Sequence, residues 1–127
     1  MNRLLSERVI GCALTVSGAL GHGFLERVYE EALSVELRAS GIVHERQKAV
    51  TVQYRGRPVG EYCCDLIVED RLLVEVKAVS ALSASHDAQL MNYLKATGLT
   101  AGLLLNFGTP KLGIRRIVTG HDDTDPI

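Results

Sequence analysis

The spacing of apolar residues changes along this 127-residue chain, and that change constrains the fold more than any other feature of the sequence. From Leu4 to Val16, and again from Phe24 to Ala39, apolar residues recur every three or four positions, which predicts two helices. From Val50 onward, apolar and polar residues alternate, which indicates a strand. A chain that begins with helices and continues with strands buries its apolar surface by packing the helices on a sheet.

Four further strands and one helix are predicted in the rest of the chain. Segments 59–68 and 72–78 are rich in strand-forming residues and are separated by a short charged loop, which favours an antiparallel hairpin. Helical spacing returns over residues 85–97. Residues 100–107 form a continuous apolar run of strand length, and residues 114–118 predict an edge strand. The order is ααβββαββ, which indicates an α/β sandwich with a mixed sheet flanked by helices.

Composition favours one soluble domain. With 46% hydrophobic and 23% charged residues, the chain can bury a core of its own, and we expect a single domain over residues 1–118 and a polar tail over 119–127. No segment approaches the roughly 18 consecutive apolar residues that a membrane helix needs. The three cysteines, two of them adjacent, suit neither a disulfide framework nor a zinc site. We therefore expect a cytoplasmic protein with no membrane partner.

Three ionisable residues stand in predicted strands that are otherwise apolar. Glu75 and Lys77 alternate with valines, so both side chains point to the same face of their strand. Asp65 lies in the preceding apolar strand, where an unpaired acid is costly. If a three-residue loop joins the two strands, Asp65 stands opposite Glu75 and Cys63 stands opposite Lys77. The hairpin therefore brings two carboxylates and an ammonium group together.

Two carboxylates so close repel each other unless one is protonated or a cation lies between them. Carboxylate oxygens with room for water suit Mg²⁺ or Mn²⁺, and a lysine beside such an ion can orient a water molecule and offset charge on a phosphate. The structural alternative is a salt bridge of Lys77 with Glu75 or Asp65 on a solvated sheet face. The residues alone leave both interpretations open.

An ordered set of motifs resembles the GxxExxY proteins, a family within the PD-(D/E)xK nuclease superfamily, over about residues 4–118. The naming motif corresponds to residues 23–29, Gly-Phe-Leu-Glu-Arg-Val-Tyr. Asp65 follows, then Glu75-Val-Lys77 after nine intervening residues, then a helix that carries Gln89. The resemblance implies a restriction-endonuclease-like fold and metal-dependent hydrolysis of phosphodiester bonds in DNA or RNA.

The resemblance also implies a set of catalytic residues, which are Glu26, Asp65, Glu75, Lys77 and Gln89. The two carboxylates on the strands would bind Mg²⁺ or Mn²⁺, and the lysine would assist the attacking water. The glutamine would support the site from its helix, and Glu26 would be the acid that an early helix contributes. For Glu26 the structural alternative is an acid that the helix dipole favours in a first turn.

Three more residues are candidates for a layer around this site: Tyr29, His86 and Tyr93. We expect the Tyr29 ring to pack in the core and its hydroxyl to bond a site carboxylate. His86 and Tyr93 share a helix face with Gln89, which either points three polar groups at the metal or forms the rim of an amphipathic helix. Both Cys63 and Cys64 are expected to be small buried hydrophobic residues.

The chain departs from the family pattern at two positions. Cys64 stands where the superfamily often has a proline before its aspartate, and this is not a ligand position. Ser17 stands in the glycine-rich approach to the GxxExxY motif, where relatives often have a histidine and a proline. Any part that this histidine plays in the family's chemistry is therefore in doubt for the present chain.

Partners are constrained less than the site. Because the formal net charge is −1, nucleic acid would have to meet a local basic patch. Candidate cations are Arg46, Lys48, Arg55 and Arg57 around the first hairpin, and Lys111, Arg115 and Arg116 near the end. A solubilising sheet edge is the alternative for both groups. A homodimer would cover more phosphates than one small domain can, but no sequence feature establishes one.

Two other functions stay open on the sequence alone. A non-catalytic module that binds nucleic acid or protein would keep the fold and the acidic pocket without turnover. A metal-dependent hydrolase of small phosphorylated molecules would act on nucleotides but not on polymers. DNA versus RNA, strandedness and sequence preference are not encoded in any motif of the chain.

Overall fold

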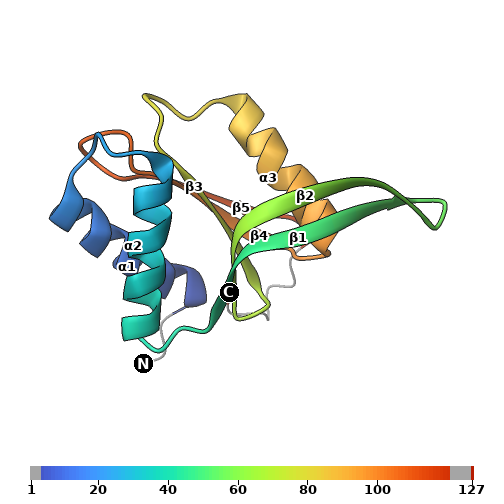
Figure 1. Cartoon of the computed structure of the whole chain (residues 1–127), viewed down its shortest axis with the longest axis horizontal. Coiled ribbons are helices and arrows are strands. Elements are labelled where there is room, and N and C mark those ends of the chain that lie inside the picture. The colour runs from blue at the N-terminus through green and yellow to red at the C-terminus, as the bar shows by residue number, and fades with distance from the viewer. Residues whose placement is uncertain (1–3, 121–126) are drawn as a thin grey trace.

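The structure is a computed structural model and describes residues 4–120 and residue 127. Its elements follow the predicted order ααβββαββ (Figure 1). The helices are α1 (Leu5–Leu20), α2 (Glu26–Ala39) and α3 (Ala84–Thr97). The strands are β1 (His44–Tyr54), β2 (Arg57–Val68), β3 (Leu72–Lys77), β4 (Ala101–Asn106) and β5 (Gly113–Val118). The predicted α/β class with a mixed sheet is confirmed.

The five strands form one sheet in the order β1-β2-β3-β4-β5. Neighbouring strands run antiparallel, except that β3 and β4 are parallel and are joined by the α3 crossover. Val68 pairs with Leu72, so a three-residue loop sets the register between β2 and β3. The hairpin of β2 and β3 and the edge position of β5 were both predicted from the sequence and are confirmed.

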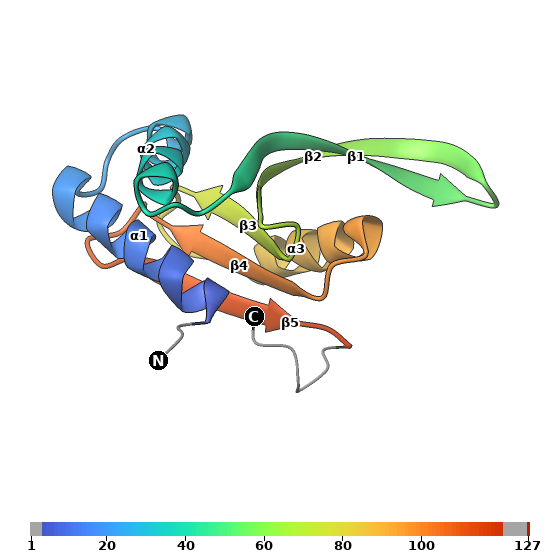
Figure 2. The same cartoon turned by 90° about the horizontal axis from the view of Figure 1, so that it is seen from below.

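Helices cover both faces of the sheet (Figure 2). α1 and α2 pack on one face, where the cluster of buried residues includes Val74 and Val76 of β3. α3 packs on the other face, against a cluster that includes Leu73. Because alternate residues of a strand point to opposite faces, Glu75 and Lys77 lie on the face that α3 covers.

The two N-terminal helices differ in how well their sequences predict the buried side. The stripe predicted for the first helix is confirmed, since its four members are all buried: Leu5, Val9, Ala13 and Val16. The periodic run predicted for the second helix is only partly right. Its member Leu37 is buried, but three others are exposed: Leu25, Val28 and Val35. The buried line consists of Tyr29, Leu33 and Leu37, whose larger side chains at four-residue spacing bury more apolar area than the valines would.

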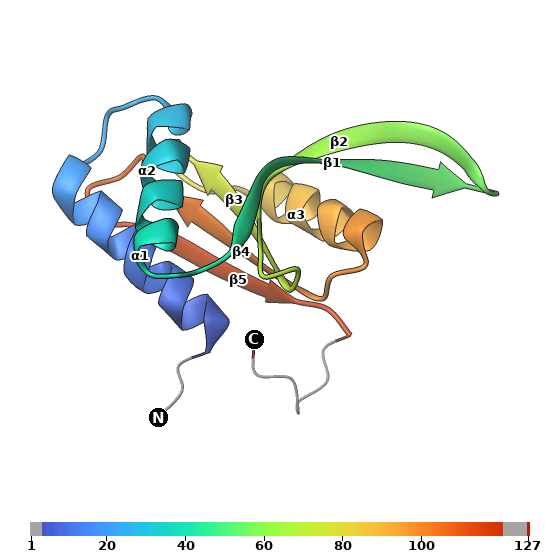
Figure 3. The same ribbon diagram turned by 60° about the horizontal axis from the view of Figure 1, so that its bottom comes forward.

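β1 and β2 continue beyond the sheet as a two-stranded ribbon (Figure 3). β2 pairs with β3 only from Leu66 to Val68, whereas its pairing with β1 extends to Arg57. Residues 48–63 are referred to below as the arm. Its tip is a two-residue turn at Arg55 and Gly56, and the pairing shifts register between Val52 and Gln53. The turn is short because Arg57 and Pro58 already belong to β2.

Of the predicted polar tail, the structure describes Thr119, Gly120 and Ile127. Ile127 is buried in the same cluster as α1, and its carbonyl oxygen accepts a hydrogen bond of 2.8 Å from the Ser6 hydroxyl. A domain boundary at residue 118 stays a prediction. Within the described ranges, no helix combines the length and the apolar character needed to cross a membrane.

Candidate active site

Asp65 and Glu75 lie at the point where β2 leaves the sheet. The ladder between β2 and β3 ends at Leu66 and Val74, and two reciprocal hydrogen bonds continue the register. The backbone N–H of Asp65 donates to Oε2 of Glu75, and the backbone N–H of Val76 donates to Oδ2 of Asp65, each at 2.8 Å. The two carboxylates therefore lie close together, as expected. Each one accepts a hydrogen bond from the backbone of the opposite strand.

Burial changes the acidity of both groups. The pKa of Glu75 rises to about 8, first because the side chain is only 3% exposed and then because Asp65 lies close by. Burial also raises the pKa of Asp65 to about 6, and the nearby charges of Glu30 and Glu26 act in the same direction. A backbone hydrogen bond and Lys77 oppose the rise without cancelling it in either group. Burial therefore disfavours the negatively charged form of both acids.

Lys77 and Gln89 connect the end of β3 to α3. The Lys77 ammonium donates a hydrogen bond of 2.8 Å to Oε1 of Gln89. Among the salt bridges of the described residues, none joins Lys77 to Glu75 or Asp65, so the simple ion-pair alternative is not formed. Lys77 still lowers the pKa of both acids through its charge, which places its ammonium close to them. The glutamine holds this cation beside the carboxylates rather than against one of them.

The buried Asn106 fixes the direction in which the chain leaves β3. Its side chain accepts a hydrogen bond from the backbone N–H of Val79 and donates one to the carbonyl oxygen of the same residue, both at 3.0 Å. It also accepts one from Gly108, whose Cα lies so close to the chain at Val79 that a Cβ would meet a backbone atom at 2.3 Å. Only glycine fits there, and Lys77 is thereby anchored from its C-terminal side.

α2 contributes two acids to the site, of which only one was predicted. Glu26 is the first residue of the helix and is exposed, and its charge raises the pKa of both Asp65 and Glu75. Glu30 lies one helical turn later and is buried. The sequence interpretation missed Glu30 because it placed the buried stripe on the wrong line of the helix. The spacing of four between the two acids, directly beside the buried Tyr29, was the available signal.

Arg46 and Gln47 of β1 hold Glu30 in place. Nη2 of Arg46 lies 2.9 Å from Oε2 of Glu30, and Nε2 of Gln47 lies 2.6 Å from its Oε1. The same Gln47 nitrogen lies 3.4 Å from Oδ1 of Asp65, so one amide spans both acids. Gln47 has a φ of 49°, which is uncommon for a residue other than glycine inside a strand. This backbone conformation turns the amide toward the site and was not readable from the sequence.

The sequence of the chain matches the family profile of the PD-(D/E)XK nuclease superfamily over residues 3–117. The chain belongs to this superfamily. The mixed α/β architecture described above agrees with the restriction-endonuclease-like fold that was predicted. No curated protein and no solved structure matches the chain. Members of the PD-(D/E)XK superfamily are nucleases, so the match supports the nuclease prediction at this level and leaves the ion and the substrate to be proposed.

In this PD-(D/E)XK chain a divalent cation would be held by Asp65 and Glu75. One oxygen of each accepts from a backbone N–H, so a cation would bind Oε1 of Glu75 and Oδ1 of Asp65, the second of which also has the long 3.4 Å contact to Gln47. Within the described residues, no group of three or more His, Cys, Asp or Glu side chains is arranged to hold a metal ion. Two repelling, desolvated carboxylates fit a hard cation that keeps several of its water ligands, as Mg²⁺ does.

The three residues predicted to surround the site have other contacts. The Tyr29 hydroxyl donates to the Gly21 carbonyl oxygen at 2.7 Å and accepts from the Phe24 N–H, so the predicted bond to a site carboxylate is wrong. His86 accepts a hydrogen bond from the Ser83 N–H at the start of α3, which makes it a helix cap. Tyr93 is buried, and the negative charge of Glu75 contributes, after burial, to raising its pKa. Tyr93 therefore lies within electrostatic range of Glu75.

The adjacent cysteines have different environments. Cys64 is buried as predicted, and burial raises the pKa of its thiol to about 12. The prediction that Cys63 is buried is wrong, because it is exposed and its thiol donates to Oε1 of Gln47 at 3.1 Å. Cys63 pairs with Ala49 of β1 in the arm, where β2 no longer pairs with β3, so it does not form a ladder pair with Lys77.

Three of the seven predicted cations are paired with acids. Arg46 binds Glu30 and Glu31, Lys48 lies 2.8 Å from Glu45, and Arg115 forms an ion pair with Asp87. Within the described part of the chain, Arg55 and Arg57 at the arm tip have no such partner. Lys111 and Arg116, near the end of the described chain, also lack an acid partner there, so the arm tip is one of two places where predicted cations are open to a polyanion.

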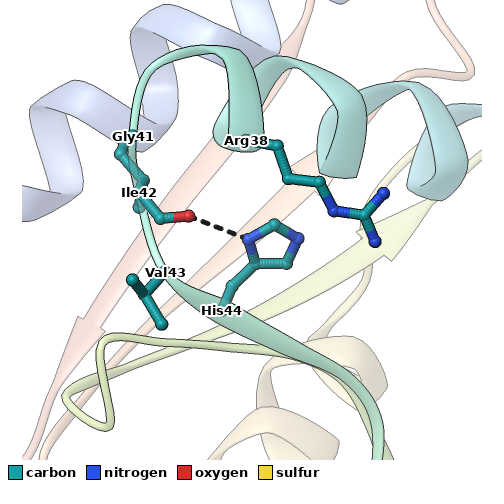
Figure 4. Close-up of a pocket in the computed structure, with 5 residues that line it drawn as sticks. All are labelled: Arg38, Gly41, Ile42, Val43 and His44. Carbon is teal, nitrogen blue, oxygen red and sulfur yellow. Dashed lines mark hydrogen bonds between the residues drawn. The ribbon is translucent and has the colours of Figure 1, made fainter.

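A pocket lies at the C-terminal end of α2, away from the predicted catalytic residues (Figure 4). It has a volume of about 300 Å³, and Arg38 and His44 supply its charged and titratable side chains. His44 lies in β1, and its ring bonds the Ile42 carbonyl oxygen and the Ser34 hydroxyl. With no carboxylate in its lining, this pocket lacks the donors of a metal site.

Proposed function

We propose that this chain is a GxxExxY-type member of its superfamily and a nuclease that hydrolyses phosphodiester bonds in DNA or RNA with Mg²⁺ or Mn²⁺. The observation that carries the proposal is the pair of desolvated, mutually repelling carboxylates, Asp65 and Glu75, with Lys77 held beside them by Gln89. The backbone hydrogen bond at the strand junction needs only an acceptor oxygen at position 75, which an uncharged amide would also supply, whereas hydrolysis of a phosphodiester uses charge at such a point.

The residues divide the chemistry between them. Asp65 and Glu75 would hold the divalent cation, which when bound supplies a positive charge opposite the phosphate. Lys77 is placed to orient the attacking water and to offset negative charge as it builds up on the phosphate oxygens. Gln89 accepts a hydrogen bond from the Lys77 ammonium and so fixes its direction. Glu26, exposed at the start of α2, is available as an additional acid facing solvent.

The second candidate is a non-catalytic module that binds nucleic acid or protein. The observation that favours it is that the described residues contain no preformed group of three metal ligands. In that case the carboxylates serve the strand junction alone, through their two backbone hydrogen bonds. Hydrolysis of small phosphorylated molecules is a further alternative that activity on mononucleotides would reveal.

The deciding experiment measures cleavage of single- and double-stranded DNA and RNA and of mononucleotides in Mg²⁺ and in Mn²⁺. Lys77→Ala is prepared in parallel, with Lys111→Ala as a control that removes an exposed lysine outside the site. We expect cleavage of a polymer that is lost in Lys77→Ala and retained in Lys111→Ala. Absence of cleavage across the whole panel would favour the binding module.

A further inference from the structure

A groove of about 460 Å³ lies between the arm and α3. The arm lines it with Gln53 and Tyr62, and α3 lines it with Asn92, Lys95 and Ala96. None of the residues that line this arm groove is acidic, and Lys95 supplies a positive charge. In a chain with a net charge of −1, a concave surface of this kind is suited to a negatively charged ligand.

The arm groove and the predicted catalytic residues share the helix α3. Gln89, which binds Lys77, is one helical turn before Tyr93, and the Tyr93 ring lies 5.4 Å from the ring of Tyr62. Asn92 and Ala96 follow Gln89 at spacings of three and seven, so they lie on the same side of α3. A ligand that runs along the groove toward β3 would therefore reach Lys77.

Exposed aromatic rings extend this surface to the tip of the arm. Tyr62 is 48% exposed although its ring contacts Tyr93, and Tyr54 is 64% exposed. Val50 packs against the cluster under α3, and Tyr54, four residues further along β1, lies on the same side of the ribbon because alternate residues share a side. Arg57 is the register partner of Tyr54, and the Arg55 guanidinium lies 5.8 Å from the centre of the Tyr54 ring. Cations and aromatic rings are thus interleaved.

The fold itself does not account for the arm. A two-stranded ribbon without a third strand is marginally stable, and no residue from 48 to 63 is buried. Arg55 has a φ of 50°, in a two-residue turn where asparagine or glycine is less strained. Large side chains at a strained and exposed turn contribute little to stability, and they are free to contact a ligand.

We propose that the arm groove binds single-stranded DNA and leads the strand to Lys77. This rests on the proposed function in so far as the strand is the substrate. Non-specific binding of a single strand uses a cationic groove for phosphates and aromatic rings on which bases stack, and both are present here. A duplex keeps its bases stacked inside and cannot use the tyrosines. The groove offers contacts to bases and to phosphates. Neither kind of contact needs a 2′-hydroxyl, so DNA contains every group that the groove would bind.

The test is the binding of a labelled 12-nucleotide oligo-dT to the full chain in EDTA, where hydrolysis does not interfere. Fluorescence anisotropy is recorded between low and moderate salt. The charge variant Arg57→Ala/Lys95→Ala is compared with Lys111→Ala/Arg116→Ala, which removes the same charge at exposed positions in and before the edge strand β5. We expect the first variant to weaken binding at least about fivefold and to lower the salt slope by about 1.4, and the control to change affinity less than about twofold.

The stacking contribution is tested by Tyr62→Ala and Tyr62→Phe. Tyr62→Ala is expected to weaken binding about tenfold and Tyr62→Phe to retain it, because the ring and not the hydroxyl stacks on a base. Circular dichroism establishes that each variant is folded. The charge variant keeps the test valid if Tyr62→Ala unfolds.

Several outcomes would overturn the inference. They are no binding by the wild type, equal losses in the charge variant and its control, tighter binding of a duplex, and at least tenfold tighter binding of oligo-U. A charge variant that changes the oligomeric state but not the affinity would assign this face to a second copy of the chain. Because binding is measured without metal, an inactive protein that binds oligo-dT would contradict the proposed nuclease and not the arm groove.

Discussion

The end of β3 and the arm place charge in opposite ways. Glu75 is buried and Asp65 is half-buried, and the pKa of each is raised chiefly by loss of water. Arg55 and Arg57 are exposed at the tip of a ribbon with no acid bound to them among the described residues. Burying an ionisable group shifts its pKa and lowers the stability of the fold. A charge exposed to water instead attracts ligands at long range, and salt screens this attraction. Chemistry is thus expected at one end and capture of the ligand at the other.

Neutralising a buried carboxylate should give the largest effect. Asp65→Asn and Glu75→Gln keep an oxygen for the backbone hydrogen bond but remove the charge, so we expect cleavage to fall by about 100- to 1000-fold. The melting temperature should stay the same or rise, because an uncompensated buried charge is costly. Initial rates and thermal unfolding measure the two effects. Glu7→Gln, at an exposed position of α1, is the control, and loss of both activity and melting temperature would mean that the charges mainly support the fold.

The next largest effect is expected from the ion pair beside the site. Arg46→Ala leaves the buried Glu30 without its cation, and we expect the free energy of unfolding to fall by about 2 kcal/mol. Lys48→Ala breaks a pair of the same short length, 2.8 Å, at the base of the arm, where both side chains are about half exposed. There we expect less than about 0.5 kcal/mol. Urea unfolding of both variants measures the contrast, and equal losses would remove it.

The pH dependence of stability tests the buried acid, Glu75, separately from the exposed charges of the arm. The pKa of Glu75 is raised from 4.5 to about 8, so between these values the folded protein binds a proton that the unfolded chain has released. Stability of the metal-free protein should therefore fall as the pH rises from about 5 to 8, by up to about 1.4 kcal/mol per pH unit for one proton. Urea unfolding at several pH values measures the slope. Glu75→Gln should flatten it, and a rise in stability over this range would contradict the assignment.

The smallest effect is expected at the arm tip. Arg55→Asn places a residue that tolerates positive φ at the first turn position, and we expect a gain of about 0.5 kcal/mol in the free energy of unfolding. The same change should weaken binding of oligo-dT, because it removes a cation that lies over Tyr54. Opposite signs for the two measurements would show that the turn is strained in favour of a ligand contact. A loss in both would indicate that Arg55 supports the turn.

The order of elements and the pairing of Asp65 with Glu75 could be predicted because both follow from local rules. A change of apolar period identifies helices and strands, and a three-residue loop fixes which strand residues face each other. The family resemblance implied that Lys77 and Gln89 belong to one site but not that they bond each other, and the structure brings the two side chains within 2.8 Å.

The contribution of α2 and β1 to the site could not be read in the same way. Glu30 and Gln47 meet through tertiary packing, and Gln47 needs a backbone conformation that its residue type does not favour. The length of the arm was also missed, since a strand pattern does not indicate where a third strand stops pairing. His86 was open to two interpretations because a cap and a ligand have the same spacing on a helix.

The reciprocal hydrogen bonds between Asp65 and Glu75 have an evolutionary consequence. Each carboxylate accepts a hydrogen bond from a backbone N–H where the two strands separate. Replacing either acid by a residue without an acceptor oxygen would leave that N–H unpaired and open the sheet. A descendant that has lost all catalytic activity would still be under selection to keep oxygen-bearing side chains at these positions. The acids by themselves are therefore poor markers of an active enzyme in this lineage, and the lysine at position 77, which closes no strand, is the better one.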